Sequence, residues 1–283
     1  MKIQKLATAL SVALLIVWPL TKQHTAKQNI PIKTGAVIND HPHATGYSSG
    51  ANLGLVIADT NNYTSACVDS LPSFITLEMP TPGDQGNQIS CVAWATVYGA
   101  GSHYIHLTTR KPYSDTGNLS PRFVYNQISK GHCTRTSVLD HLYLLKTQGS
   151  CTLNNMPYDP NDCSTQPDSL QRILAENYRI KGWEKIDLHD RTLLKRAISE
   201  SKPVIFSIVP DEGFKRISAP FIWNKREGAI DAAHSMIIVG YDDAKKAFRI
   251  MNSWSTHWGD KGFAWIDYNF FLGNVLEGGH III

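Results

Sequence analysis

The sequence has little net charge and no strongly charged segment. Its 283 residues carry 27 Lys and Arg against 24 Asp and Glu, a formal net charge of +3. The basic residues do not gather into a dense run, so a nucleic-acid partner is not expected. The chain has no repeat of fixed period and no low-complexity tract, which argues against a solenoid or a linker-rich protein. With 42% apolar and 18% charged residues, its composition is that of an ordinary globular protein.

Cysteine is also scarce, and its spacing is not that of a metal site. The five cysteines form no C-x-x-C pair and the histidines no H-x₃-H pair, which are the spacings typical of zinc sites. Zinc binding is therefore the weaker interpretation, and neither a metal nor a cofactor is expected. If Cys91 is a reactive thiol, an even set of four remains, with three possible disulfide pairings: Cys67, Cys133, Cys151 and Cys163.

No apolar run near the N-terminus is long enough for a comfortable membrane span. Lys2 and Lys5 precede residues 6–20, fifteen positions without a charge, which is typical of a signal peptide. We expect a signal peptide over residues 1–26 with cleavage after Ala26, and an uncleaved anchor is the alternative. Either way, the body of the protein is expected to be secreted or periplasmic, where disulfides persist. No other membrane association is expected.

The rest of the chain changes from a helical to a strand-like pattern. Apolar residues recur at helical spacing over residues 91–107. Further helices are predicted over residues 123–128, 138–149 and 169–177. Beyond Lys202, strands bounded by Gly, Pro and Asp are predicted over residues 204–209, 234–241, 248–252 and 262–267. A helical half followed by a strand-rich half predicts an α+β fold, in one domain over residues 69–283.

Three distant segments carry residues suited to catalysis. Cys91 stands in Gln-Gly-Asn-Gln-Ile-Ser-Cys-Val-Ala-Trp, where a loop is expected to turn into a helix. His234 stands in Ala-His-Ser-Met-Ile-Ile-Val-Gly-Tyr and Asn252 in Met-Asn-Ser-Trp. Each residue alone is better explained as a packing or structural side chain. Together, a thiol, an imidazole and an amide are the parts of a cysteine nucleophile with its base and orienting group.

His234 and Asn252 are expected to meet across a hairpin. The two predicted strands flank Asp242-Asp-Ala-Lys-Lys, a strong turn signal. If the turn centres on Asp243, antiparallel register places residue 234 opposite residue 252. Opposed residues share a face of the sheet, with Cβ atoms about 4.5–5.5 Å apart. The Asn252 amide would then orient the imidazole.

These segments resemble the papain family of cysteine peptidases, in its divergent bacterial form. His234 follows Cys91 by 143 residues, within the roughly 130–150 typical of the family. The resemblance runs from about residue 71 to residue 271. It includes Asp84-Gln-Gly, Leu119-Ser-Pro-Arg-Phe-Val-Tyr, Met156-Pro-Tyr, Lys202-Pro-Val and Trp258-Gly-Asp-Lys-Gly. It implies a two-lobed fold, with a helical left lobe, an antiparallel β-rich right lobe and an active-site cleft between them.

The resemblance also implies a role for each residue. Cys91 would attack the substrate carbonyl, and His234 would act as acid and then base. Asn252 would orient His234, and Trp254 would shield their contact from water. The Gln85 side chain and the Cys91 backbone N–H would form the oxyanion hole.

The resemblance implies one disulfide and one departure from the family pattern. It favours a Cys133–Cys163 bridge, which leaves Cys67 and Cys151 as a second pair. Gln88 stands where the family usually has a cysteine, three residues before the nucleophile. The customary bridge beside the active site is therefore not expected.

Residues 27–68 are interpreted as an N-terminal extension or short pro-segment. They are rich in Asn, Thr, Gly and Ser, and their apolar run at residues 54–59 is expected to be an edge strand on the domain. A sharper hypothesis is that the segment lies over the cleft and keeps the protein latent.

The function that follows is that of a monomeric cysteine-type peptidase acting on protein or peptide substrates. A cell-wall amidase or transpeptidase with the same three residues is one alternative. A non-enzymatic binding protein on the same scaffold is the other.

Overall fold

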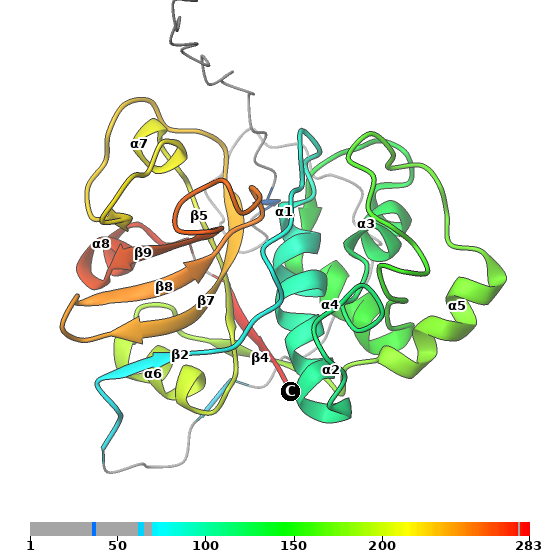
Figure 1. Cartoon of the computed structure of the whole chain (residues 1–283), viewed down its shortest axis with the longest axis horizontal. Helices are drawn as coiled ribbons and strands as arrows, with labels where there is room; N and C mark the ends of the chain where they lie inside the picture. The colour runs from blue at the N-terminus through cyan, green and yellow to red at the C-terminus, as the bar shows by residue number, and fades with distance from the viewer. Residues whose placement is uncertain (1–35, 38–61, 65–69, 277) are drawn as a thin grey trace, which may run out of the picture. The chain divides into compact units, whose positions relative to one another are not determined.

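The computed structural model describes residues 62–64, 70–276 and 278–283, and the backbone of residues 36–37 (Figure 1). The predicted signal peptide, the apolar run at residues 54–59 and Cys67 lie outside the described residues. Ile32–Ile283 belong to one compact unit. Among the helices of the described residues, none has the length and apolar character needed to cross a membrane.

A long helix beginning at Cys91 forms the middle of the fold. It consists of α1 (Cys91–Ala93), η1 (Trp94–Gly101), which is wound as a π-helix, and α2 (Ser102–Thr109). All residues of α1 and η1 are buried, because other helices pack on one side of them and a sheet on the other (Figure 1). A small residue is needed for this contact at Gly99, where a Cβ atom would lie 2.6 Å from Cδ1 of Ile237 in the sheet.

The helical lobe lies on one side of the long helix. It contains α3 (Pro121–Ser129), α4 (Val138–Thr147), α5 (Ser169–Ala175) and the 3-10 turn η2 (Glu176–Tyr178). The side chains of Ser120, Ser137 and Asp168 accept hydrogen bonds from the first N–H groups of α3, α4 and α5, which fixes where each helix begins. Phe123 and Leu142 belong to the apolar core that these helices share with the long helix.

The sheet lies on the other side. Its strands are β2 (Phe74–Thr76), β4 (Trp183–Ile186), β5 (Val204–Ile208), β6 (Ile222–Trp223), β7 (His234–Asp242), β8 (Ala247–Met251), β9 (Phe263–Asp267) and β10 (Gly279–Ile282). They follow the order β4-β10-β5-β7-β8-β9-β6, and β2 also pairs with β7. All these pairs are antiparallel except β6 with β9.

Three short helices accompany the sheet. They are α6 (Arg191–Ser199), α7 (Glu212–Lys215) and α8 (Tyr268–Asn274). Phe206 of β5, Phe248 of β8 and Phe271 of α8 pack edge to face in a second core. The arrangement confirms the predicted α+β fold with a helical lobe and a largely antiparallel β-rich lobe.

The register of the β7–β8 hairpin is not the predicted one. Asp242 opposes Ala247, and beyond a bulge Ile237 opposes Met251, so continuing the ladder places residue 254, not 252, opposite His234. The turn between the two strands is longer than predicted. The Asp242 carboxylate accepts hydrogen bonds from the backbone N–H groups of Ala244 and Lys245, which stabilises the longer turn. The error is two residues, which leaves residues 252 and 254 on the same face.

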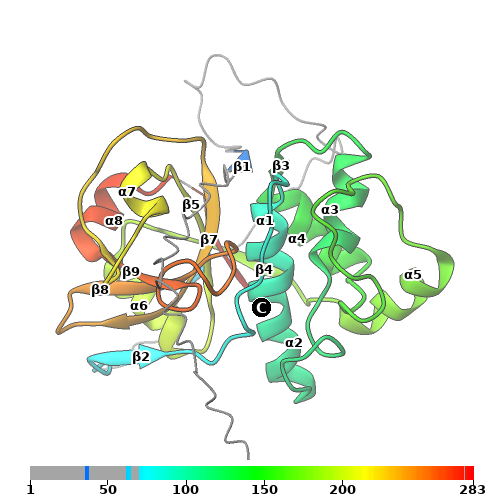
Figure 2. The same cartoon turned by 45° about the horizontal axis from the view of Figure 1, so that its top comes forward.

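Two parts of the predicted extension pair with the rest of the protein. One joins the sheet, and the other pairs with a short strand next to the long helix. Asn62 forms a parallel bridge with Lys185 of β4, and Tyr63 is buried in the core of the β-lobe. The backbone of β1 (Ala36–Val37) pairs in parallel with β3 (Thr136–Ser137), which directly precedes α4. Figure 2 shows this pair near the α1 end of the long helix.

Candidate active site

Cys91 is the first residue of the long helix and has no exposed surface. It forms a small apolar cluster with Val92, against which Val138 of α4 and Ala233 pack. Ala233 immediately precedes β7, and α1 contacts β7 directly. The fold therefore brings the Cys91 end of the helix to the strand that begins with His234.

His234 is held by Asn252 through one ring nitrogen. Nε2 of His234 lies 2.7 Å from Oδ1 of Asn252, and the same oxygen accepts a 2.8 Å hydrogen bond from the backbone N–H of Ser253. An amide oxygen only accepts, so Nε2 carries the proton in this contact. Within the described part of the chain, the other nitrogen, Nδ1, has no hydrogen-bond partner. It is the nitrogen that can exchange a proton with a reacting group.

Burial has a large effect on the imidazole. It lowers the pKa of His234 to about 4, against smaller opposing effects from the Asn252 hydrogen bond and the Asp231 charge. A buried imidazolium loses its hydration, so the neutral ring is favoured in this closed site.

Trp254 covers one face of the His234 ring. The two rings stack with centroids 4.7 Å apart, and the indole itself is buried. Phe214 and Trp258 pack on Trp254 from behind. The observed register of the β7–β8 hairpin, continued beyond β8, places residue 254 opposite His234. Trp254 therefore lies beside the contact between His234 and Asn252.

Gln85 is fixed on both sides of its amide. Ser253 donates a 2.7 Å hydrogen bond from Oγ to Gln85 Oε1, and the Gln85 backbone N–H donates to the carbonyl of Ser253 at 2.9 Å. The Gln85 amide nitrogen donates to the carbonyl of Gln88 at 2.9 Å. The amide nitrogen is therefore turned toward the segment that leads into Cys91, and the oxygen toward the segment that follows Asn252.

The five residues singled out in the sequence thus come from both lobes to one region. Sequence reasoning gave no role to Ser253, which links the Asn252 and Gln85 contacts, nor to Tyr158, whose hydroxyl reaches the loop before Cys91. The position of Ser253 directly after Asn252 was the only signal for the first. Among the described residues, no group of three or more His, Cys, Asp or Glu side chains is arranged to hold a metal ion.

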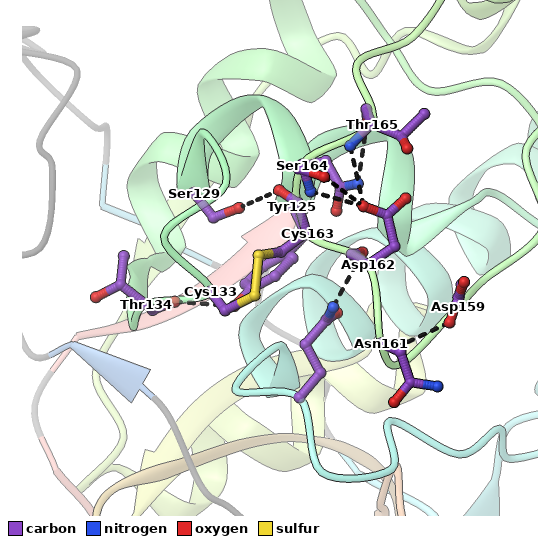
Figure 3. Close-up of a disulfide and its surroundings, with 12 residues drawn as sticks. Tyr125, Ser129, Cys133, Thr134, Asp159, Asn161, Asp162, Cys163, Ser164 and Thr165 are labelled. Carbon is purple, nitrogen blue, oxygen red and sulfur yellow. Dashed lines mark hydrogen bonds between the residues drawn. A yellow bond between two sulfur atoms is a disulfide. The ribbon is translucent and has the colours of Figure 1, made fainter.

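The cysteines outside the site are arranged in two ways. Cys133 and Cys163 form a disulfide beside the helical lobe, the pair that the resemblance implies (Figure 3). Cys151 is a free, buried thiol, so the second bridge, between Cys67 and Cys151, is not formed. Cys151 is enclosed by the core of the helical lobe, and burial raises its pKa to about 12.

The sequence of the chain also matches a known protein family. The sequence profile of the papain family of cysteine proteases matches residues 79–273. The chain belongs to the papain family of cysteine proteases.

The curated proteins that this chain resembles are distant in sequence. Gamete and mating-type specific protein A of Dictyostelium discoideum is 29% identical over 187 residues, which covers 64% of this chain and 38% of that protein. Peptidase 1 of Euroglyphus maynei is 24% identical over 237 residues, 80% of this chain and 71% of that protein. The chain therefore spans well under half of the length of the first relative.

A solved papain-family structure shares the fold. Xylellain, a cysteine protease from Xylella fastidiosa, superposes with a TM-score of 0.72 at 20% sequence identity. The match covers 89% of this chain and 96% of xylellain. At this identity the likeness shows the two-lobed papain fold.

Proposed function

We propose that the protein is a cysteine peptidase that hydrolyses peptide bonds through Cys91, His234 and Asn252. The observation that carries the proposal is the 2.7 Å hydrogen bond from His234 Nε2 to Asn252, in a papain-family chain whose Cys91 begins the neighbouring helix. This bond orients the His234 ring and occupies Nε2. Nδ1 would therefore be the nitrogen that donates and accepts the proton during the reaction. The unpaired N–H groups at the start of a helix favour negative charge on the sulfur of Cys91.

The proposed reaction uses these groups in the following order. The Cys91 thiolate attacks the carbonyl carbon, a C–S bond forms, and the carbonyl electrons move onto oxygen. The oxyanion then collapses, the C–N bond breaks, and the amine leaves with a proton from Nδ1 of His234. Water attacks the resulting thioester and gives a proton to Nδ1, and the carboxylic acid product leaves as the C–S bond breaks. The sulfur returns as thiolate beside an imidazolium.

The developing oxyanion would be held by Gln85 and by the backbone N–H of Cys91. The Gln85 amide nitrogen bears two protons, and one of them is donated to the carbonyl of Gln88. We propose that the same amide nitrogen donates to the oxyanion. A donor fixed in this way is worth roughly 2.7–4 kcal/mol of transition-state stabilisation, and Ser253 supports the assignment because it prevents the amide from rotating. Trp254 would keep water from the His234–Asn252 bond.

The part of the extension before Asn62 would keep the enzyme latent. Cys91 and His234 have no exposed surface, so a polypeptide substrate reaches them only after a segment of the protein moves away. β1 pairs with Thr136–Ser137, and the next residue, Val138, packs against the Cys91 cluster. Of the described elements, β1 is the one from the extension that lies beside the site.

Export is a further part of the proposal. Residues 1–26 would act as a signal peptide that directs the protein to the periplasm or the medium. The Cys133–Cys163 disulfide supports this location, because such bonds rarely persist in the cytosol.

The experiment that tests the proposed function is labelling of a chain beginning at Asn61, which lacks the inhibitory part of the extension, with a thiol-directed epoxide, followed by a peptide-library assay. We expect one label, on Cys91, and loss of all turnover on labelling. Cys91→Ala should fold normally and show no turnover. Cys151→Ala is the matched control, since it removes a thiol that burial holds protonated, and it should label and turn over as the wild type does. Turnover that persists in Cys91→Ala would refute the assignment, and transfer products in place of hydrolysis products would indicate a transpeptidase.

A further inference from the structure

The loop that joins Gln85 to Cys91 is tied to the tip of one side chain. The hydroxyl oxygen of Tyr158 lies 2.9 Å from the carbonyl oxygen of Gln85, 2.9 Å from Oε1 of Gln88 and 2.7 Å from Oγ of Ser90. These three partners cover the loop from the oxyanion glutamine to the residue before the nucleophile. Few backbone hydrogen bonds hold this loop, so its shape depends on side-chain contacts such as these.

The protons in this cluster can be assigned. A carbonyl and an amide oxygen only accept, so the Tyr158 O–H donates to Gln85 and Gln88, while the Ser90 hydroxyl can donate to Tyr158. Burial raises the pKa of Tyr158 to about 12, so the hydroxyl remains a donor throughout the neutral range. The cluster is therefore satisfied by one tyrosine proton shared between two acceptors of the loop.

Tyr158 is itself held firmly. Its ring meets Trp94 edge to face, with centroids 4.8 Å apart. Gln88 donates from its amide nitrogen to the carbonyl of Asp162 at 3.1 Å, and Asp162 precedes Cys163 of the disulfide (Figure 3). The loop before Cys91 is thus anchored to a segment that is covalently joined to Cys133.

We propose that Tyr158 is a positioning residue for the oxyanion hole. Its hydroxyl fixes the position of the Gln85 carbonyl and the path of the backbone over residues 88–90. It thereby fixes the position of the Gln85 amide relative to the Cys91 N–H. The proposal rests on the proposed peptidase function. Gln88 occupies the position at which the papain family usually has a disulfide-bonded cysteine. In this chain the polar contact of Gln88 with Tyr158 therefore restrains the loop that a disulfide restrains in other members.

Tyr158→Phe isolates the hydroxyl from the ring. Removing it keeps the ring contact with Trp94 but releases the loop. Oxyanion donors act only when fixed within a few tenths of an ångström. We expect kcat for a peptide substrate to fall by about tenfold and KM to change by less than about twofold. Alkylation of Cys91 by iodoacetamide, which forms no oxyanion, should keep the wild-type rate.

The assays use the full-length protein, activated in the same way as the wild type. Tyr241→Phe is the matched control, because it also removes one hydroxyl, which donates a 2.8 Å hydrogen bond to the carbonyl of Pro72 in the β-lobe. It should leave kcat unchanged. Gln88→Met is a second variant that removes the Tyr158 partner with little change in size. It should also lower kcat while leaving the alkylation rate of Cys91 unchanged. In the double variant, the fall in kcat should be smaller than the product of the falls in the two single variants.

Two results would overturn the proposal. One is an unchanged kcat in Tyr158→Phe. The other is a parallel fall of kcat and alkylation rate, which would indicate a displaced thiol or a loosened fold. Absence of turnover in the wild type would instead refute the proposed function, so the two failures are distinguishable.

Discussion

Asn252 uses a single oxygen for two purposes. The oxygen accepts from His234 Nε2 and from the N–H of Ser253, so it orients the His234 ring and fixes its own side chain at once. The sequence predicted roles for Asn252, His234, Cys91 and Gln85 because their neighbours form recognisable motifs. It could not give the second contact of each one, because those partners become neighbours only when the chain folds.

Asn252→Ala should lower kcat/KM by about tenfold to a hundredfold. The imidazole would keep its place under Trp254 but lose the acceptor that selects the Nε2 proton, so Nδ1 would less often be the nitrogen with the correct protonation. Asn252→Asp should retain orientation and raise the pKa of His234, because a carboxylate favours the imidazolium. Steady-state kinetics across pH 5–8 measures both effects. Equal kcat/KM in wild type and Asn252→Ala would mean that the bond is structural.

At the scale of helices and strands, the β7–β8 hairpin shows which features the sequence pattern predicts and which it does not. The predicted helices and strands have ends near the observed ones, because apolar runs such as β5 and β7 are buried along their whole length and turn residues bound them. The register was wrong by two residues, because the Asp242 side chain lengthens the turn and a bulge shifts the ladder. The strands β4 and β10 were missed, because each has only four residues and they pair with each other across nearly 100 positions of sequence.

The Cys133–Cys163 disulfide is the element that restrains the segment carrying Tyr158. The bond closes a loop of 30 residues, which in the chain-entropy description is worth about 3–4 kcal/mol of stability. Replacing both cysteines by serine should lower the free energy of unfolding by that amount and also lower kcat, since the Gln88–Asp162 contact loses its anchor.

Urea unfolding and steady-state kinetics on the same preparation test this expectation. Cys151→Ser, which removes a sulfur without opening a bridge, is the comparison. A double serine variant as stable as the wild type would show that the loop is held by its hydrogen bonds alone.

At the scale of the whole molecule, Cys91 and His234 are closed off from solvent. Cys91 and His234 are both buried, and burial lowers the pKa of His234 to about 4, whereas the peptidase mechanism needs an imidazolium beside a thiolate. The two facts are compatible if the structure is the latent form. Between pH 5 and pH 8 the closed His234 is neutral. Water admitted to the site would remove the cause of the lowered pKa, and the ion pair could then form.

Removal of β1 should therefore activate the protein and change its pH dependence. A chain beginning at Asn61 keeps Tyr63, which is buried in the β-lobe, and loses the strand that pairs with Thr136–Ser137. We expect alkylation of Cys91 by iodoacetamide at pH 5.5 to be more than about tenfold faster than in a chain beginning at Lys27, with peptide turnover appearing in parallel, because an imidazolium lowers the pKa of an adjacent thiol by several units. Ala36→Pro with Val37→Pro, in the chain beginning at Lys27, removes two backbone donors from β1 without shortening the protein and should give the same acceleration. Equal alkylation rates and equal turnover in all three proteins would show that β1 does not control access, and that the burial of Cys91 and His234 has another cause.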